Sequence, residues 1–538
     1  MRVTKKLRKL RNLKISINLG KPKQKVLPPA APPRVVPRGH RIVERYPLYE
    51  PFVHAAIVQN PSTGEYKYVL DELQLDGLER SIYNRVLDIL LSEIESPKEE
   101  ITDPRKFFAN EARKIVDKYR ITLGWLPDVS WYKILYYAER DLVGYGKIDP
   151  FMRDGNIEDV SCDGVGKPAY VWHRKYESIE SNLCFTTDEE LDNTVVKLVH
   201  MGGKHVSSAF PIVDASLPGK HRLAVCYRRE VTPFGTAFTI RKFREDPYSI
   251  IDLINIGTFS EGMAAYFWMC LENRASIMVL GGTAAGKTTA LNALACLIKP
   301  GSKIITIEET AELNLPHENW VSLIARKSYG LGESLSGEVT LFDLVKTSMR
   351  HRPDVLIVGE VRGNEAYVLF QALATGHGGM CTMHAENLDF AMKRLTSKPM
   401  DIASSYLRLM NIVLSVQRVH LEKQGERRVN RRVMAVDEIA DYEDYRNTFK
   451  WNPVKDEYPA YLENSIMLSN ISERVGYSKK ELIKEIEHRV NVLHWMREQN
   501  IRSYKDVAAI IAEYSTRPKE FYERVFVGEE LVATSRHT

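Results

Sequence analysis

The chain has 538 residues, of which 44% are hydrophobic and 27% are charged, and its formal net charge is +5. These values describe a soluble globular protein of about three or four domains. The six cysteines form no C-x-x-C pair, and no run of about eighteen apolar residues occurs, so we expect no zinc ribbon, disulfide framework or membrane span.

The first 25 residues carry Lys and Arg throughout and no acid. Leu7, Leu10 and Ile17 fall near helical spacing, which predicts a basic amphipathic helix that lies on anionic lipid or docks on an acidic partner. A solvated, disordered tail explains the pattern equally well. No apolar segment follows, which argues against a signal peptide. Prolines up to Pro37 predict an extended linker, so residues 1–40 form a tail.

Residues 41–143 predict a hairpin followed by helices. Two apolar runs between Tyr46 and Leu70 flank the turn signal Asn60-Pro-Ser-Thr-Gly64. Asp103 is a predicted N-cap, because Pro104 suits the first helical position. No residues in this region have the spacing of a catalytic motif, so we interpret it as an adaptor module. Its helical patterns lie at about 73–94, 104–119 and 130–142.

Residues 144–246 predict an α+β domain, with short β-rich runs around one helix near 189–200. Late in this region lie several arginines, for which a solvated basic face is the ordinary interpretation. Since they precede the phosphate-binding motif described next, contact with phosphate across a domain or subunit boundary is the alternative. The arginines are Arg222, Arg228, Arg229, Arg241 and Arg244.

The stretch SIMVLGGTAAGKTT, residues 276–289, carries the pattern G-x-x-x-x-G-K-[ST] between an apolar strand and a predicted helix at 290–298. The loop N–H groups and the helix N-terminus are expected to surround a β-phosphate, with Lys287 on the β- and γ-phosphates and the Thr288 hydroxyl on Mg²⁺. The sequence therefore predicts a bound nucleoside triphosphate. The predicted contacts are Gly281, Gly282, Thr283, Ala284, Ala285, Gly286, Lys287, Thr288 and Thr289.

Two further buried strands, at 303–307 and 355–358, end in acids. Ligands bind at the carboxyl ends of parallel strands, so Glu308 and Glu309 are predicted to hold Mg²⁺ through water. Glu360 is the candidate to polarise the water that attacks the γ-phosphate. Asp354 precedes its strand and is interpreted as a structural residue.

His377 and His384 bracket a short strand at 380–383 in a glycine-rich setting. No third His or Cys lies nearby at ligand spacing, so contact of an imidazole with the γ-phosphate is favoured over metal binding. Farther on, runs at 410–416 and 432–439 predict paired strands joined by a solvated basic loop, QGERRVNRR. Helices are predicted near 478–499, 504–514 and 518–525.

The order of these motifs, P-loop, acidic box, G-E-V-R and T-G-H…H-A, closely resembles the superfamily of type II/IV secretion and type IV filament motor ATPases. The amino-acid sequences of several segments look most like those of the archaeal branch, which powers archaella and adhesive pili. The resemblance covers about residues 140–442. The segments that carry the resemblance include GYGKIDPFMRDGNIEDVSCDG, ASLPGKHR, FTIRKF, GEVTLFDLVKTSMRHRPDVLIVGEVRGNEAYVLFQALATGHGG and TMHAEN.

The resemblance implies an α/β fold in which an α+β domain, residues 144–246, precedes a RecA-like P-loop core, residues 247–445, with a C-terminal helical region at 446–538. It also implies homo-hexameric rings that use ATP and Mg²⁺. Ala285 replaces the usual Ser or Gly, Glu309 replaces the common Asp, and the zinc module of many bacterial members is missing. Carried over, the nucleotide-contacting and catalytic positions are Lys287, Thr288, Glu308, Glu309, Glu312, Glu360, Arg362, His377, His384, Arg222 and Arg241, with Arg229 a poorer match.

By the same resemblance, ATP is expected to close the two domains so that Arg222 and Arg241 reach the phosphates, while His384 senses loss of the γ-phosphate. The implied function is a cytoplasmic motor at the inner face of the membrane that assembles a filament through a polytopic platform protein. Pilus retraction or type IV secretion is the alternative. A RecA-like nucleic-acid translocase is a second alternative. However, basic and aromatic residues do not alternate as they do in a groove that binds a nucleic-acid strand, so no nucleic acid is expected as a partner.

Overall fold

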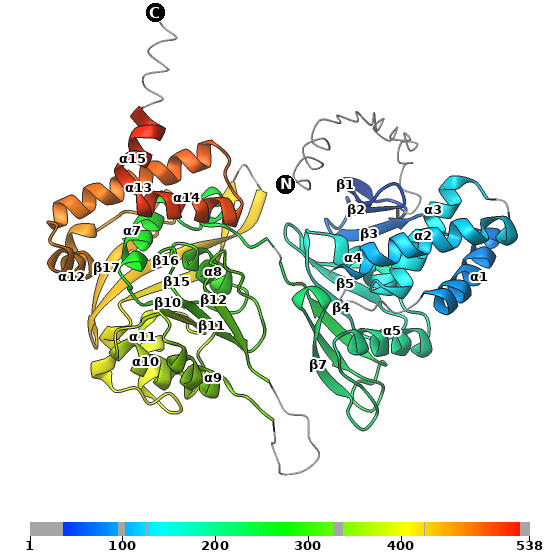
Figure 1. Cartoon of the computed structure of the whole chain (residues 1–538), viewed down its shortest axis with the longest axis horizontal. Coiled ribbons are helices and arrows are strands. Elements are labelled where there is room, and N and C mark those ends of the chain that lie inside the picture. The colour runs from blue at the N-terminus through cyan, green and yellow to red at the C-terminus, as the bar shows by residue number, and fades with distance from the viewer. Residues whose placement is uncertain are drawn as a thin grey trace, which may run out of the picture. The chain divides into compact units, whose positions relative to one another are not determined.

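The structure, a computed structural model, describes residues 36–94, 103–124, 126–244, 246–326, 337–423 and 426–527. The chain divides into two compact units, residues 1–242 and 243–538. Each unit has its own sheet and its own helices (Figure 1). The basic helix predicted within residues 1–25 lies outside the described residues.

The first unit is built on a nine-stranded sheet in the order β1-β2-β3-β6-β5-β4-β9-β8-β7. Neighbouring strands are antiparallel except for the parallel pair β3 and β6. The strands are β1 (Arg41–Tyr49), β2 (Val53–Gln59), β3 (Tyr66–Glu72), β4 (Ile157–Cys162), β5 (Pro168–His173), β6 (Glu177–Cys184), β7 (Ile212–Leu217), β8 (His221–Cys226) and β9 (Ala237–Arg241).

The predicted hairpin is confirmed as β2 and β3, whose turn is closed by a hydrogen bond from Gly64 N to Asn60 O at 2.8 Å. The sequence did not indicate where this hairpin pairs. Tyr68 in β3 lies opposite Ser181 in β6, and its hydroxyl donates to Asp154 at 2.8 Å. The early strands therefore share one sheet with the strands of the later α+β region.

The three predicted helices of the adaptor region are confirmed, and Asp103 caps the second one by accepting from Lys106 N at 3.1 Å. Their apolar faces form one cluster with Phe52 and Val53 from the start of the sheet. The helices of this unit are α1 (Gly77–Glu93), α2 (Pro104–Leu123), α3 (Asp128–Leu142), α4 (Asp149–Arg153) and α5 (Asp188–Met201).

The second unit is built on an eight-stranded sheet in the order β12-β11-β13-β14-β10-β15-β16-β17. The strands from β12 to β15 are parallel, and β16 and β17 continue the sheet antiparallel. They are β10 (Ile277–Leu280), β11 (Ile304–Glu308), β12 (Trp320–Ile324), β13 (Val355–Val358), β14 (Gly378–Met383), β15 (Ile412–Lys423), β16 (Glu426–Asp441) and β17 (Asp444–Lys450).

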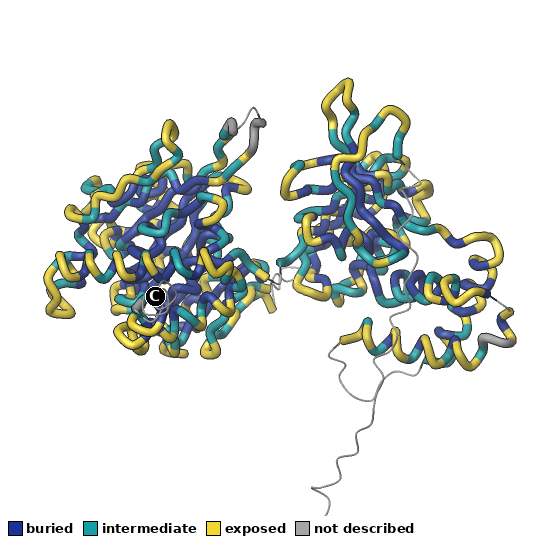
Figure 2. Tube along the Cα trace, turned by 90° about the horizontal axis from the view of Figure 1, so that it is seen from above, coloured by how far each residue is buried: buried dark blue, intermediate teal, exposed yellow. Residues whose placement is uncertain are grey.

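Helices cover both faces of the parallel part of this sheet, which is why the central strands β10 and β13 are apolar throughout. Ile277 and Val279 of β10 pack into one hydrophobic cluster, whereas Met278 and Leu280 pack into another on the opposite face. The strands are accordingly buried (Figure 2). The helices are α6 (Ile250–Asn255), α7 (Glu261–Glu272), α8 (Lys287–Ala295), α9 (Leu341–Ser348), α10 (Glu365–Ala374) and α11 (Leu388–Thr396).

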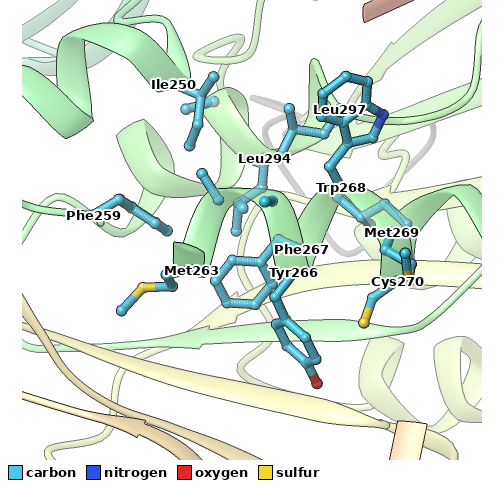
Figure 3. Packing of buried hydrophobic residues seen from close by; sticks show 14 of the residues in the cluster. Ile250, Phe259, Met263, Tyr266, Phe267, Trp268, Met269, Cys270, Leu294 and Leu297 are labelled. Atoms are coloured by element: carbon cyan, nitrogen blue, oxygen red, sulfur yellow. The ribbon is translucent and has the colours of Figure 1, made fainter. Parts of the chain in front are cut away.

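Helix α7 is the centre of the first cluster, where it meets α8 (Figure 3). The C-terminal helices add to this cluster: the rings of Trp268 and Tyr514 lie 5.1 Å apart. These helices are α12 (Ile466–Val475), α13 (Lys479–Glu498), α14 (Tyr504–Thr516) and α15 (Pro518–Tyr522). Over the described part of the chain, every helix is too short or too polar to span a membrane.

A buried carboxylate joins the sheet to the C-terminal helices. Glu438 of β16 is only 1% exposed, and it accepts hydrogen bonds from the hydroxyls of Tyr266 and Ser465, each at 2.5 Å. Its other oxygen accepts from the backbone N–H groups of Ile466 and Met467 at the start of α12. A buried charge is tolerated only where it is satisfied in this way, so Glu438 fixes α12 against the sheet.

Replacing Glu438 by Gln is expected to lower the stability of the second unit by about 2–3 kcal/mol, because an amide N–H then faces backbone N–H donors and a charge-assisted contact is lost. Thermal unfolding of the full chain measures the change. Glu473→Gln is the matched control, since Glu473 is an exposed carboxylate on α12. Equal melting temperatures for the two variants would contradict this role of Glu438.

Candidate functional site

The phosphate-binding loop joins β10 to α8 at the carboxyl edge of the parallel sheet, as the sequence predicts. Gly281 lies against β15, where an added Cβ would meet the carbonyl oxygen of Val416 at 2.5 Å. Gly286 caps α8 with φ +94°, a conformation that favours glycine. Ala284 adopts φ +57° as well, and the side chain of Ala285 is buried. The loop is therefore held in one tight conformation.

Lys287 begins α8, and its ammonium group donates to the carbonyl of Gly282 at 2.9 Å, across the loop. The side chain is half-buried, and burial lowers its pKa, while the carboxylates of Glu360 and Glu312 oppose that shift. Thr288 and Thr289 follow in the first turn of the helix. The Lys287 ammonium group and the N-terminus of α8 thus lie close together, an arrangement that suits a bound phosphate.

The glutamates of the acidic box after β11 differ in their surroundings. Glu308 is 3% exposed, and one of its oxygens accepts from the backbone N–H groups of Glu312 and Leu313 at 2.9 and 3.0 Å. This carboxylate shapes the turn after the strand. Glu309 is exposed and lies 3.8 Å from a guanidinium nitrogen of Arg362. Its predicted contact with Mg²⁺ stays a prediction.

Glu360 follows β13 and faces the phosphate loop. Arg362 donates to its Oε2 at 2.6 Å, whereas its Oε1 is buried with no hydrogen-bond partner among the described residues. Burial raises the pKa of Glu360, but Arg362, Lys287 and His384 outweigh burial, so the net pKa is lowered. The result is an ionised carboxylate with one oxygen available to a small polar ligand such as water.

The two predicted histidines lie at opposite ends of β14. His384, at the carboxyl end, has its Nε2 3.4 Å from the Thr283 hydroxyl, and its backbone oxygen accepts from Arg394 at 2.8 Å. Burial, followed by the Lys287 charge, lowers the pKa of His384, so the imidazole is neutral near pH 7. This arrangement suits the predicted phosphate contact.

The position of His377 does not fit the predicted contact with a nucleotide held by the same loop. His377 precedes β14, and its Nδ1 lies 2.9 Å from the Thr375 hydroxyl and 3.1 Å from the carbonyl of Ala372. Since β14 is parallel to β10 and its six residues span about 20 Å, His377 lies at the far edge of the sheet from the loop.

The sequence also predicted a solvated loop at QGERRVNRR, and this was wrong for most of the segment, because β16 already begins at Glu426. Arg431 in that strand reaches the phosphate loop, where its Nε donates to the carbonyl of Ala284 at 3.3 Å. No motif marks this contact. Val429 and Val433 stand four residues apart among arginines, so the segment lacks the period-two alternation that indicates a half-buried strand.

Of the predicted arginines, Arg222, Arg229 and Arg241 belong to the first unit. Arg222 in β8 and Arg241 in β9 are direct cross-strand neighbours, and Arg241 pairs with Asp159 at 3.2 Å. Arg229 is exposed and pairs with Asp188 at 3.1 Å. The structure brings Arg222 and Arg241 together, and their contact with phosphate stays a prediction.

The donor set fits a magnesium nucleotide. Loop N–H groups, Lys287 and the start of α8 supply positive charge to phosphates, and Thr288 supplies a hydroxyl for Mg²⁺. Within the described ranges, no three His, Cys, Asp or Glu side chains cluster as a metal site. Mg²⁺ bound with nucleotide needs no such cluster, because phosphate oxygens and waters complete its shell.

Substitution of Gly286 by Ala is expected to destabilise the loop by about 1–2 kcal/mol, because the new side chain must adopt φ +94°. Its Cβ would also lie 2.9 Å from Cδ of Arg431. Gly282→Ala is the matched control, since an added Cβ there meets nothing within 4 Å. Thermal unfolding of both variants checks this. A larger loss for the Gly282 variant would contradict the account of the loop.

Comparison with known proteins identifies relatives of this site. The family described as "Type II/IV secretion system protein" matches residues 157–455. An uncharacterized protein of Methanocaldococcus jannaschii is 35% identical over 500 residues, which cover 87% of this chain and 88% of that protein. The conjugal transfer protein TrbB of Rhizobium radiobacter is 31% identical over 47% of this chain and 73% of its own length.

Among solved structures, the VirB11 ATPase of the Brucella suis type IV secretion system aligns with 53% of this chain and 90% of its own length. Its sequence identity is 21% and its TM-score is 0.27.

Proposed function

The chain belongs to the type II/IV secretion system protein family, and from this premise we propose that it is an ATP hydrolase acting as the motor of a membrane-bound machine. The observation that carries the proposal is the pairing of the phosphate loop with Glu360. A half-buried cation at a helix N-terminus lies at the same sheet edge as an ionised carboxylate, one oxygen of which is buried with no hydrogen-bond partner in the part of the chain that the structure describes.

In the proposed reaction, the loop N–H groups and Lys287 hold the β- and γ-phosphates of ATP. Mg²⁺, held by the Thr288 hydroxyl together with the phosphates, would neutralise charge that develops on the phosphate oxygens. Glu360 accepts a hydrogen bond from the attacking water through Oε1 and so orients it. Arg362 fixes the carboxylate through the other oxygen. His384, a neutral donor beside Thr283, contacts the terminal phosphate.

Glu360→Gln is expected to retain ATP binding and to lose turnover by about 10²–10⁴-fold, the range for removal of a general base. Steady-state phosphate release and equilibrium ATP binding are the measurements. Glu318→Gln, an exposed carboxylate before β12, is the control and is expected to match the wild type. Wild-type turnover in the Glu360 variant would remove this residue from the reaction.

At the level of the cell, we propose a homo-hexamer on the inner face of the membrane that powers assembly of a pilus-like or archaellum-type filament through a polytopic platform protein. Family membership and the sequence resemblance to the archaeal branch support this. Type IV secretion is the second candidate, favoured by the similarity to a protein named for conjugal transfer.

Deleting the gene in its own host distinguishes these candidates. Loss of surface filaments, restored by the wild type but not by Glu360→Gln, is expected for an assembly motor. An excess of filaments would indicate retraction instead. Filaments at wild-type number combined with loss of DNA or protein transfer would favour the secretion candidate and contradict filament assembly.

A further inference from the structure

Strand β14 lies between the two strands whose ends carry the proposed reaction. It pairs with β10, which leads into the phosphate loop, and with β13, which leads to Glu360. Thr382 of β14 is 1% exposed and lies opposite Val279 of β10, two residues before the loop begins at Gly281. The spacing between the phosphate loop and Glu360 is therefore set through this part of β14.

Thr382 holds the backbone on both sides of Glu360. Its hydroxyl donates to the carbonyl of Gly359 at 2.6 Å, and its own carbonyl accepts from the N–H of Val361 at 2.9 Å. Strand β13 has already ended at Val358. The two hydrogen bonds therefore extend the connection with β14 past the end of the strand, across the residue that carries the carboxylate.

Strand β11 holds the same segment from its other side. The N–H of Gly359 donates to the carbonyl of Ile307 at 2.8 Å. A Cβ added at Gly359 would lie only 3.1 Å from Cγ of Glu308. The backbone before Glu360 thus lies between β11 and β14, with little room on the β11 side, and the Thr382 hydroxyl binds it on the β14 side.

The carboxylate of Glu360 depends on this backbone for its position. Arg362 holds Oε2 at 2.6 Å, but the Arg362 side chain is itself exposed. Oε1 is the oxygen proposed to orient the attacking water. Because a displacement of about 1 Å can lower a rate about 10²-fold, the position of that oxygen has to be fixed from the backbone as well as from the ion pair.

We infer that Thr382 is a positioning residue for Glu360, and that its hydroxyl fixes the peptide before the glutamate so that Oε1 meets the attacking water. This inference rests on the proposed function. The carbonyl of Thr382 would be kept by any residue in the strand, so the hydroxyl is the specific element. Valine has nearly the same shape as threonine, but it would leave the Gly359 carbonyl facing a methyl group instead of a donor.

The test compares turnover with nucleotide binding in variants of the full chain. Thr382→Val is expected to lower kcat about 10–100-fold and to leave the Kd of the nucleotide unchanged, because the phosphate loop is not altered. Thr382→Ser is expected to retain most of the turnover, since it keeps the hydroxyl. Steady-state phosphate release gives kcat, and titration calorimetry with a non-hydrolysable ATP analogue gives Kd.

Thr306→Val is the matched control. Thr306 is a fully buried threonine of β11 in the same sheet, and its hydroxyl accepts from Nε1 of Trp320 at 2.9 Å. This variant also loses a buried hydroxyl and its hydrogen bond, so it is expected to unfold at a lower temperature but to keep wild-type turnover. An equal loss of turnover in both valine variants would indicate general damage to the sheet and would overturn the inference.

A double variant separates positioning from an independent contribution. Thr382→Val is expected to have no further effect on the single-turnover rate of Glu360→Gln, because the carboxylate that it positions is already lost. The same fold loss in both backgrounds would show that Thr382 acts without Glu360, and would overturn the inference. Wild-type kcat in Thr382→Val would overturn it as well. Wild-type protein that binds the analogue but releases no phosphate from ATP would instead refute the proposed hydrolysis, on which the inference rests.

Discussion

The site depends on one electrostatic constraint, the placement of a half-buried ammonium group at the start of α8 and opposite a carboxylate. Burial lowers the pKa of Lys287, and Glu360 offsets part of that effect. The same charge lowers the pKa values of Glu360 and His384. A bound phosphate supplies negative charge beside the Lys287 ammonium group. The surrounding loop, strand ends and arginines therefore suit one class of ligand, phosphates.

Strand β16 links this site to the rest of the second unit. Within a short stretch it carries Arg431 against the phosphate loop, Arg432 in its pairing with Asp456, and Glu438 under the start of α12. The C-terminal helices and the phosphate loop thus contact the same strand, the helices through the buried Glu438 and the loop through the exposed Arg431.

Much of this architecture was predictable from the sequence, and the exceptions have physical causes. The strand, glycine loop and helix at residues 277–295 are local and strongly patterned, and acids after apolar runs mark the carboxyl edge. The pairing of β3 with β6 joins segments far apart in the chain, and no local pattern specifies such a partner. That His377 lies at the other end of β14 from the loop could not be foreseen, because a pair of histidines flanking a strand does not indicate which end faces the ligand. Arg431 was missed because the part of β16 around it is rich in charged residues, and such a sequence is also typical of a solvated loop.

The central claim is that the loop at 281–289 binds the phosphates of ATP beside Glu360 and the antiparallel pair β15 and β16. Amide hydrogen exchange of the full chain, with and without a non-hydrolysable ATP analogue and Mg²⁺, tests this most directly. The account predicts slower exchange in the loop, in the segment around Glu360 and in β16 near Arg431, with the amino edge around His377 unaffected. Unchanged exchange in the loop at saturating analogue would contradict it.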